Sequence, residues 1–205
     1  MLFFKKSEEK IFLPEPDNET NPAKNQLSDF IWETLKVIII SLAIIIPVRY
    51  FLIQPFYVKG ASMEPNFYDH EYLIIDEITY RLNKPHRGDV IVFRYPNDPR
   101  QFFIKRIIGL PGETVKLQKG VITVKNSQQP DGFVLNEDLY LPNTHTQGSQ
   151  ELKLNIDEYY VLGDNRVSSF DSRMFGPVKE DNIIGRAWIR GWPFDRITIF
   201  KHPTF

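Results

Sequence analysis

The chain has 205 residues, of which 42% are hydrophobic and 14% aromatic, so it is long enough to form one compact core. A formal net charge of −1 argues against a nucleic-acid binder, which usually carries a basic excess. The absence of cysteine excludes disulfides, a thiolate nucleophile and zinc bound by cysteine.

The N-terminal part is predicted to be a flexible tail followed by a membrane span. Residues 1–28 are polar, mixed in charge and interrupted by three prolines, as is typical of a disordered segment. The stretch LKVIIISLAIIIPVRYFLI, residues 35–53, would be about 28 Å long as a helix, close to the hydrocarbon thickness of a bilayer. Lys36 and Arg49 stand near its ends, where long side chains can reach the interface. We therefore predict a transmembrane anchor over residues 29–54.

Two other interpretations of this stretch stay open. It could be a buried helix of a soluble domain, although its centre is nearly all Ile, Val and Leu with no polar face. It could also be a cleaved signal peptide, although 34 residues precede it, which is long for the charged region of such a peptide. Four lysines lie before the span, against Arg49 and Lys59 close after it, and this bias favours a cytoplasmic N-terminus with residues 55–205 on the extracytoplasmic face.

From residue 55 onward the pattern changes to short strands. The strand-like segments are apolar, rich in β-branched residues and bounded by turn residues: EYLIIDEI (71–78), GDVIVFRY (88–95), QFFIKRIIGL (101–110), ETVKLQKGVITV (113–124), EYYVLGD (158–164) and IIGRAWIR (183–190). A tight hairpin is predicted at Lys119-Gly120. Residues 126–156 are polar and loop-like, and no helical period follows residue 60. We predict a mostly β domain over 55–205, with a small inserted β/loop subdomain at about 115–157.

The first cluster that could carry chemistry is VKGASMEP, residues 58–65. Small residues before Ser62 let the backbone turn sharply and leave its amides open to a ligand. Ser62 is then either a reactive hydroxyl or an ordinary turn residue.

The second cluster is a lysine inside the strand-like segment at residues 101–110. A period of two places Phe103, Lys105 and Ile107 on one face, and Ile104 and Arg106 on the other. Apolar surroundings make an amine lose its proton more easily. The alternatives are a lysine that protects an edge strand or one that extends to water.

The third cluster is the loop GDNRVSSFDSRMFG, residues 163–176. It combines acids, arginines and three serines between two strand-like segments. It could be only a turn held by ion pairs, but the density of charges beside small hydroxyls is unusual for a solvated linker.

Together these clusters resemble the bacterial type I signal peptidases, membrane-bound endopeptidases of peptidase family S26. The resemblance runs from about Pro55 to Gly185 and includes SMEP (62–65), RGDVIVF (87–93), KRIIGLPGE (105–113) and GDNRVSSFDSRMFG (163–176), in the family's order. It implies an antiparallel β-fold behind one N-terminal transmembrane helix. It also implies cleavage of signal peptides from exported preproteins after small residues of the Ala-x-Ala type.

The resemblance implies roles for single residues. Ser62 is the expected nucleophile and Lys105 the base that accepts its proton, in a Ser/Lys dyad that works through an acyl-enzyme. Ser169 is expected to hydrogen-bond and orient the lysine, whereas Ser168 is expected to be a bystander. The backbone N–H of Ser62 is expected in the oxyanion hole.

Further positions follow from the same match. Many family members place a second oxyanion donor, a serine hydroxyl, at the position of Gly60, so the second donor here stays undetermined. The side chains expected to line apolar substrate pockets are Phe56, Val58, Met63, Phe67, Phe103 and Ile104. The residues expected to hold the loops of the site by ion pairs are Arg106 with Asp164, and Asp171 with Arg173.

No metal or cofactor is expected, because the four histidines are scattered and have no H-E-x-x-H spacing. The expected partners are signal peptides, the lipid bilayer of the plasma membrane and the protein-export machinery. Two alternatives remain: a self-cleaving Ser/Lys peptidase, and a catalytically inactive, membrane-anchored β-domain that binds peptides.

Overall fold

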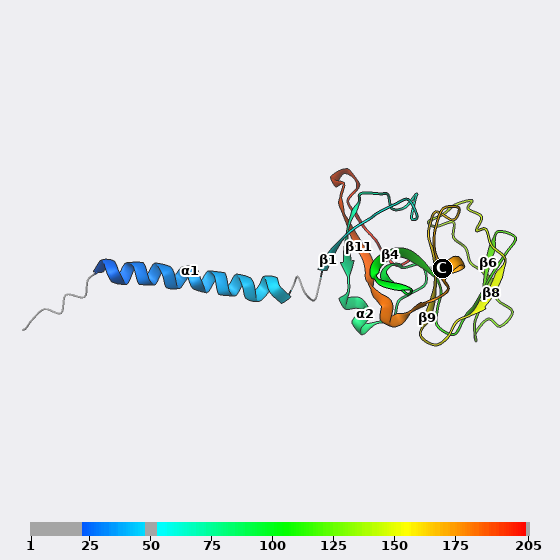
Figure 1. The fold of residues 1–205 in the computed structure, drawn as a ribbon, viewed down its shortest axis with the longest axis horizontal. Helices are drawn as coiled ribbons and strands as arrows, with labels where there is room; N and C mark the ends of the chain where they lie inside the picture. Colours follow the sequence, from blue (N-terminus) through cyan, green and yellow to red (C-terminus); the bar gives the residue numbers. More distant parts are fainter. Residues whose placement is uncertain (1–21, 48–52, 204–205) are drawn as a thin grey trace, which may run out of the picture. The chain divides into compact units, whose positions relative to one another are not determined.

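The computed structural model describes residues 22–47 and 53–203, which belong to two separate compact units (Figure 1). The first unit ends at Ile45 and contains all but the last two residues of the helix α1 (Pro22–Pro47). The second is mostly β, as predicted, and is called the β-domain below.

Helix α1 begins before the predicted anchor, so residues 22–28, which we expected in the flexible tail, are helical. The side chains of residues 28–46 are exposed, apart from a half-buried Ser41. Among the described residues, no helix combines the length and the apolar character that a membrane crossing requires. The rest of the predicted tail, residues 1–21, and residues 48–52 of the predicted anchor lie outside the described residues.

The main sheet of the β-domain is antiparallel and has eight strands. Its strands are β1 (Ile53–Tyr57), β2 (Tyr72–Asp76), β3 (Val90–Tyr95), β4 (Asp98–Gly109), β9 (Glu158–Leu162), β10 (Val178–Lys179), β11 (Ile183–Trp192) and β12 (Thr198–Ile199). Their order is β1-β2-β11-β3-β4-β9-β10, with β12 added to β11. Each of the predicted strand segments in this sheet is confirmed.

Strand β4 changes partners along its length. It pairs with β3 from Asp98 to Arg106, whereas its pairing with β9 begins only at Arg106. Residues before Arg106 therefore have one edge that β9 does not cover. Lys105 lies at the point where the two strands separate.

A second sheet is formed by β5 (Thr114–Gln118), β6 (Val121–Lys125), β7 (Phe133–Val134) and β8 (Gln150–Lys153), in the order β7-β6-β5-β8. The predicted hairpin is confirmed, because Lys119 and Gly120 turn the chain between β5 and β6 with φ values of 51° and 84°. In Figure 1, β6 and β8 lie on the side of the β-domain away from β1 and β11, with β4 and β9 between them.

Three apolar clusters form the core of the β-domain. One joins the second sheet to β4 and β9 through Ile108, Tyr160 and Leu162. The others lie against β2, β3 and β11, and between β3, β4 and β9. Strands such as β3 and β9 contribute alternate side chains to different clusters, which explains why a period of two was visible in the sequence.

The short helical segments after residue 60 were not predicted from the sequence. The short helices α2 (Ile78–Leu82) and α3 (Ser172–Phe175) are one turn or little more. The 3-10 turns η2 (Glu180–Asn182) and η3 (Phe194–Arg196) are shorter still. Segments of this length cannot show a 3.6-residue repeat, because a repeat needs at least two turns.

Candidate active site

Ser62 begins a tight turn between β1 and β2 and is half-buried. The turn is closed by backbone hydrogen bonds from Glu64 to Ala61 and from Phe67 to Met63. Just before it, Gly60 has a φ of +84°, a conformation that glycine adopts without strain. The turn presents the Ser62 hydroxyl to the edge of β4.

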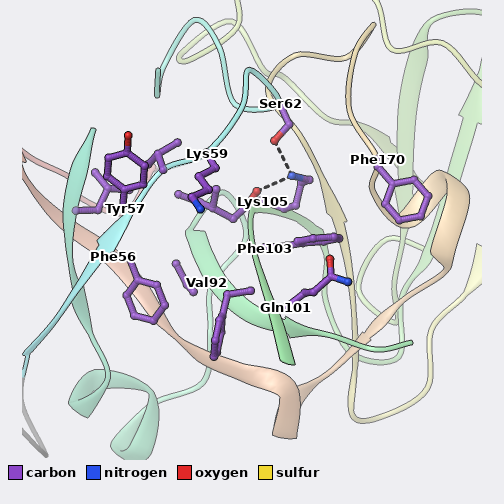
Figure 2. Close-up of a pocket in the computed structure, with 13 residues that line it drawn as sticks. Phe56, Tyr57, Lys59, Ser62, Val92, Gln101, Phe103, Lys105 and Phe170 are labelled. Atoms are coloured by element: carbon purple, nitrogen blue, oxygen red, sulfur yellow. Dashed lines mark hydrogen bonds between the residues drawn. The ribbon is translucent and has the colours of Figure 1, made fainter. Parts of the chain in front are cut away.

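The amine of Lys105 meets this hydroxyl. Its Nζ lies 2.7 Å from Ser62 Oγ and 2.8 Å from the carbonyl oxygen of Ile104, and both contacts are drawn in Figure 2. The Lys105 residue is only 4% exposed, and its amine lies 5.7 Å from the centre of the Phe103 ring. The predicted pair is therefore within hydrogen-bond reach.

Burial determines the charge of this amine. Desolvation lowers the pKa of Lys105 to about 8, and the carboxylates of Asp171 and Asp164 act in the opposite direction. Neither carboxylate forms an ion pair with the lysine. A neutral amine has a lone pair that can accept the Ser62 proton, whereas an ammonium can only donate.

The loop after β9 closes over the serine turn. Asn165 donates a hydrogen bond from its backbone N–H to the Ser62 carbonyl oxygen at 3.1 Å, and another from its side chain to the Ala61 carbonyl oxygen at 3.1 Å. A Cβ atom at Gly163 would lie 2.4 Å from the Ser62 carbonyl oxygen and 2.1 Å from Ser169 Oγ. Only glycine permits this close approach of the two loops.

Ser169 lies in this loop, close to Gly163, but it does not complete the predicted contact. Its Oγ is buried and makes no hydrogen bond within the described residues, although it lies near enough to Asp171 to lower the pKa of that carboxyl slightly. A hydroxyl can influence a carboxylate in this way without forming a well-directed hydrogen bond. The structure thus does not join Ser169 to Lys105.

Asp171 holds the far end of the loop. Its carboxylate accepts two hydrogen bonds from the Arg173 guanidinium, both at 2.8 Å, and one from Gly163 N–H at 3.1 Å. Burial alone would raise the pKa of Asp171, but these hydrogen bonds outweigh it and hold the pKa below its usual value. The predicted pair is present.

Arg106 and Asp164 form a second buried pair, with contacts of 2.8 and 2.6 Å. The remaining guanidinium nitrogen donates to the Gly88 carbonyl oxygen, and the Tyr140 ring lies 4.0 Å from the guanidinium carbon. Asn66, in the serine turn, also donates to Asp164 at 2.8 Å. This one carboxylate therefore connects β4, the loop after β9 and the turn that carries Ser62.

A cleft of about 650 Å³ opens beside the Ser62–Lys105 pair (Figure 2). Most of its lining side chains are apolar: Phe56, Tyr57, Val58, Lys59, Ser62, Leu73, Val92, Gln101, Phe102, Phe103, Ile104, Lys105 and Phe170. Of the six predicted pocket residues, Phe56, Val58, Phe103 and Ile104 are in this lining. Met63 and Phe67 are not, because the turn directs both into the core, where each is 1% exposed.

Some residues that shape the site were missed in the sequence. Arg166 is buried and forms a bidentate pair with Glu137 at 2.5 and 2.6 Å, while its Nε donates to the Gly163 carbonyl oxygen at 2.9 Å. Asn66 and Asn165 were also not assigned. Arg166 lies in the charged loop of residues 163–176, but its partner Glu137 lies in the polar segment 126–156, which was interpreted as an insertion. Sequence spacing alone could not show that the two residues meet.

On the oxyanion side of the site, the Ser62 backbone N–H is an available donor. The Ser62 backbone N–H makes no hydrogen bond within the described residues. The Gly60 N–H is occupied, since it donates to Asp69 Oδ1 at 2.9 Å. Gly60 therefore offers neither a hydroxyl nor an unengaged amide to a developing negative charge.

A hydroxyl in contact with a buried, carboxylate-free amine, at the wall of an open apolar cleft, is the arrangement of a serine hydrolase that uses lysine as its base. The family model described as "Signal peptidase, peptidase S26" matches residues 31–192. The chain therefore belongs to the signal peptidase family, peptidase S26, and is a serine peptidase.

Named relatives agree with this assignment. The chain is 34% identical to a probable signal peptidase I-2 of Synechocystis over 87% of its length and 82% of that protein. It is 34% identical to a signal peptidase I of Leptolyngbya laminosa over 89% of its length and 92% of that protein. It is also 34% identical to signal peptidase I V of Bacillus subtilis, over 72% of its length and 90% of that protein.

Proposed function

We propose that this protein removes signal peptides from exported preproteins, with Ser62 as nucleophile and Lys105 as general base. The observation that carries the proposal is the 2.7 Å contact between the serine hydroxyl and a buried amine whose pKa is lowered to about 8. Four sequence relatives of the chain are named signal peptidase I or probable signal peptidase I, which supports the choice of substrate.

The reaction follows from these two groups. Lys105 Nζ accepts the Ser62 proton as Oγ forms a bond to the scissile carbonyl carbon, and the carbonyl oxygen becomes an oxyanion facing the Ser62 N–H. The ammonium then gives that proton to the leaving amine as the peptide bond breaks, which leaves an ester on Ser62. Lys105 next deprotonates a water molecule, which attacks the ester carbonyl carbon. The ammonium returns this proton to Ser62 Oγ as the ester bond breaks, and the new C-terminal carboxylic acid leaves and loses its own proton to solvent.

The substrate would bind as an added strand. Residues 101–105 of β4 have an edge that β9 does not cover, and this edge borders the cleft. An extended peptide would place alternate side chains into the cleft beside Phe56 and Ile104. The walls there are bulky apolar side chains, and we expect small substrate side chains to fit between them best.

We further propose that residues 29–54 anchor the enzyme in the plasma membrane, with the N-terminus cytoplasmic and the β-domain outside. The exposed apolar side chains of α1 from Val37 to Ile46 support this, together with the apolar sequence that continues to Ile53. The enzyme would then meet a membrane-bound preprotein and the export machinery in one plane. Carbonate extraction should leave it in the membrane fraction, and protease added outside intact cells should degrade the β-domain.

The test of the activity is cleavage of a model preprotein by purified wild type and Ser62→Ala. Wild type should release the mature chain, whereas Ser62→Ala should show no release above the uncatalysed rate while remaining folded. If neither protein cleaves but both bind the preprotein equally, the chain is a peptide-binding domain. If wild type cleaves only its own chain and Ser62→Ala cleaves nothing, it is a self-cleaving peptidase.

A further inference from the structure

A carboxylate with fixed orientation lies away from the Ser62 cleft, in the turn before β3. The Asp89 side chain is only 3% exposed. Its Oδ2 accepts hydrogen bonds from the Tyr80 hydroxyl at 2.6 Å and from the His86 backbone N–H at 3.0 Å. These two donors hold the carboxylate plane in place before any other group approaches it.

Two histidines that are far apart in sequence meet at this carboxylate. His202 Nδ1 lies 2.6 Å from Asp89 Oδ1, and His86 Nδ1 lies 3.8 Å from Oδ2. The two imidazole rings pack edge to face with their centres 4.8 Å apart. One ligand atom from each of the three residues lies within 4.8 Å of the other two.

Imidazole nitrogens and a carboxylate oxygen are the ligand types that zinc prefers in proteins. Zinc prefers imidazole nitrogen and carboxylate oxygen at about 2.0–2.2 Å in a tetrahedron, which places neighbouring ligand atoms about 3.3 Å apart. His202 Nδ1 is closer than that to Asp89 Oδ1, at 2.6 Å, and His86 Nδ1 is farther from the other carboxylate oxygen, at 3.8 Å. The His86 side chain is 61% exposed and can rotate to close the longer gap, while the Tyr80 hydrogen bond orients Asp89 as outer contacts of metal ligands do.

We propose that His86, Asp89 and His202 bind one divalent transition-metal ion of the zinc type, with water in the remaining position. The ion would fasten the C-terminal segment to the turn before β3. That turn is already joined to β4, because Gly88 N–H donates to the Ile107 carbonyl oxygen at 2.8 Å. None of the three ligands lines the cleft at Ser62, so the ion stabilises the fold and takes no part in peptide cleavage.

This site could not be predicted from the positions of the histidines in the sequence. His202 lies beside Asp89 only because the C-terminal segment folds back to the turn before β3. Phe200 leads into it: its ring packs 4.7 Å from the Phe67 ring, and its N–H donates to the Trp188 carbonyl oxygen at 2.8 Å. These contacts seat the segment and carry His202 to Asp89.

The test is titration of the full chain, in detergent and stripped of metal, with zinc chloride by calorimetry, and with cobalt by visible absorption. Wild type should bind one ion with micromolar affinity, and cobalt should show the bands of a four-coordinate ion. At a hundredfold excess over Kd, zinc should raise Tm by roughly 5–10 °C. Magnesium should not compete, because it prefers oxygen ligands.

Variants of the proposed ligands test where the ion binds. His86→Ala and His202→Ala should each weaken zinc binding at least tenfold and abolish the rise in Tm, with metal-free Tm values near wild type. His145→Ala removes an exposed histidine of the segment between β7 and β8 and should bind zinc as wild type does. Wild type without stoichiometric binding, or equal binding by wild type, His86→Ala and His202→Ala, would overturn the proposal. A chelator should leave preprotein cleavage unchanged well below Tm, so this test is independent of the proposed peptidase activity.

Discussion

Lys105 and Arg106 are adjacent on β4 and equally buried, yet their surroundings differ completely. Arg106 faces Asp164 through two short hydrogen bonds and also donates to a backbone carbonyl. Lys105 faces a hydroxyl and a carbonyl, and its pKa is lowered to about 8. One side of the strand therefore stabilises a cation, and the other side destabilises one.

The difference shows how burial alone can make a base. A buried charge is tolerated when a carboxylate and hydrogen bonds replace water, as they do for Arg106. Without that carboxylate, desolvation favours the neutral amine, as it does for Lys105. The alternation of side chains along one strand is enough to separate a structural cation from a reactive amine by a single residue.

Removing the amine should have the largest effect on activity. Lys105→Met keeps the length and the apolar contacts but has no base, so kcat for preprotein cleavage should fall by at least about 10³-fold. Lys105→Arg should be equally inactive, because arginine remains protonated at all relevant pH values. Turnover near the wild-type rate in either variant, measured by release of the mature chain, would remove the role of Lys105.

Removing Arg106, the cation paired with Asp164, should mainly lower the free energy of unfolding. Arg106→Met leaves the buried Asp164 carboxylate without its partner, and the free energy of unfolding should fall by about 3–5 kcal/mol. Lys105→Met is the matched control and should be as stable as wild type or more stable at pH 7, because it removes a cation that burial disfavours. Urea unfolding followed by tryptophan fluorescence compares them. Equal losses in the two variants would mean that the two cations are held alike.

The pH dependence of kcat/KM should reflect the lowered pKa of Lys105. Only the neutral amine accepts a proton, so kcat/KM should fall about tenfold per pH unit below the pKa of Lys105 and level off above about pH 8. A rate independent of pH between 6 and 9 would contradict this, whatever the absolute activity.

Stability should also change with pH because of the lowered pKa of Lys105, but in the range above that pKa. The pKa of Lys105 is about 8 in the folded chain against 10.5 for an ordinary lysine, so between these values the unfolded chain binds more protons. Stability relative to Lys105→Met should therefore rise with pH across that interval, by about 3 kcal/mol in total. Below about pH 8 the full cost of the buried ammonium should be present.

The smallest effect on activity is expected at Ser169, because its hydroxyl makes no hydrogen bond to Lys105 in this structure. In its neutral form, Lys105 has two N–H donors, of which one is taken by the Ile104 carbonyl oxygen, so a small movement of Ser169 Oγ would give the other a partner. Ser169→Ala should lower kcat by about tenfold with KM unchanged. Ser168→Ala removes the exposed neighbouring hydroxyl and should behave as wild type. Equal rates for both variants across the pH range would show that Ser169 does not orient the lysine.

Local patterns in the sequence predicted much of the fold and of the candidate site. Alternation in QFFIKRIIGL predicted strand β4 and put Lys105 and Arg106 on opposite faces, and Lys119-Gly120 predicted the hairpin of the second sheet. These features depend on neighbouring residues, which the sequence displays directly.

Long-range features could not be read in the same way. Arg166 meets Glu137 through the packing of the second sheet against the loop after β9, and His202 meets Asp89 at the end of the C-terminal segment. Met63 and Phe67 were placed in the substrate pockets by family position, yet the turn after Ser62 sends them into the core. Such contacts depend on where the whole chain brings two segments together.

The most direct measurement is the pKa of the Lys105 amine itself, followed by NMR on protein labelled with ¹⁵N in its lysine side chains. Lys105→Arg identifies the signal, and the labelled protein is titrated from pH 6 to 11. The account predicts a midpoint near pH 8, well below that of the exposed lysines. A midpoint near the ordinary value of 10.5 would show that the amine stays charged at neutral pH and cannot serve as the base.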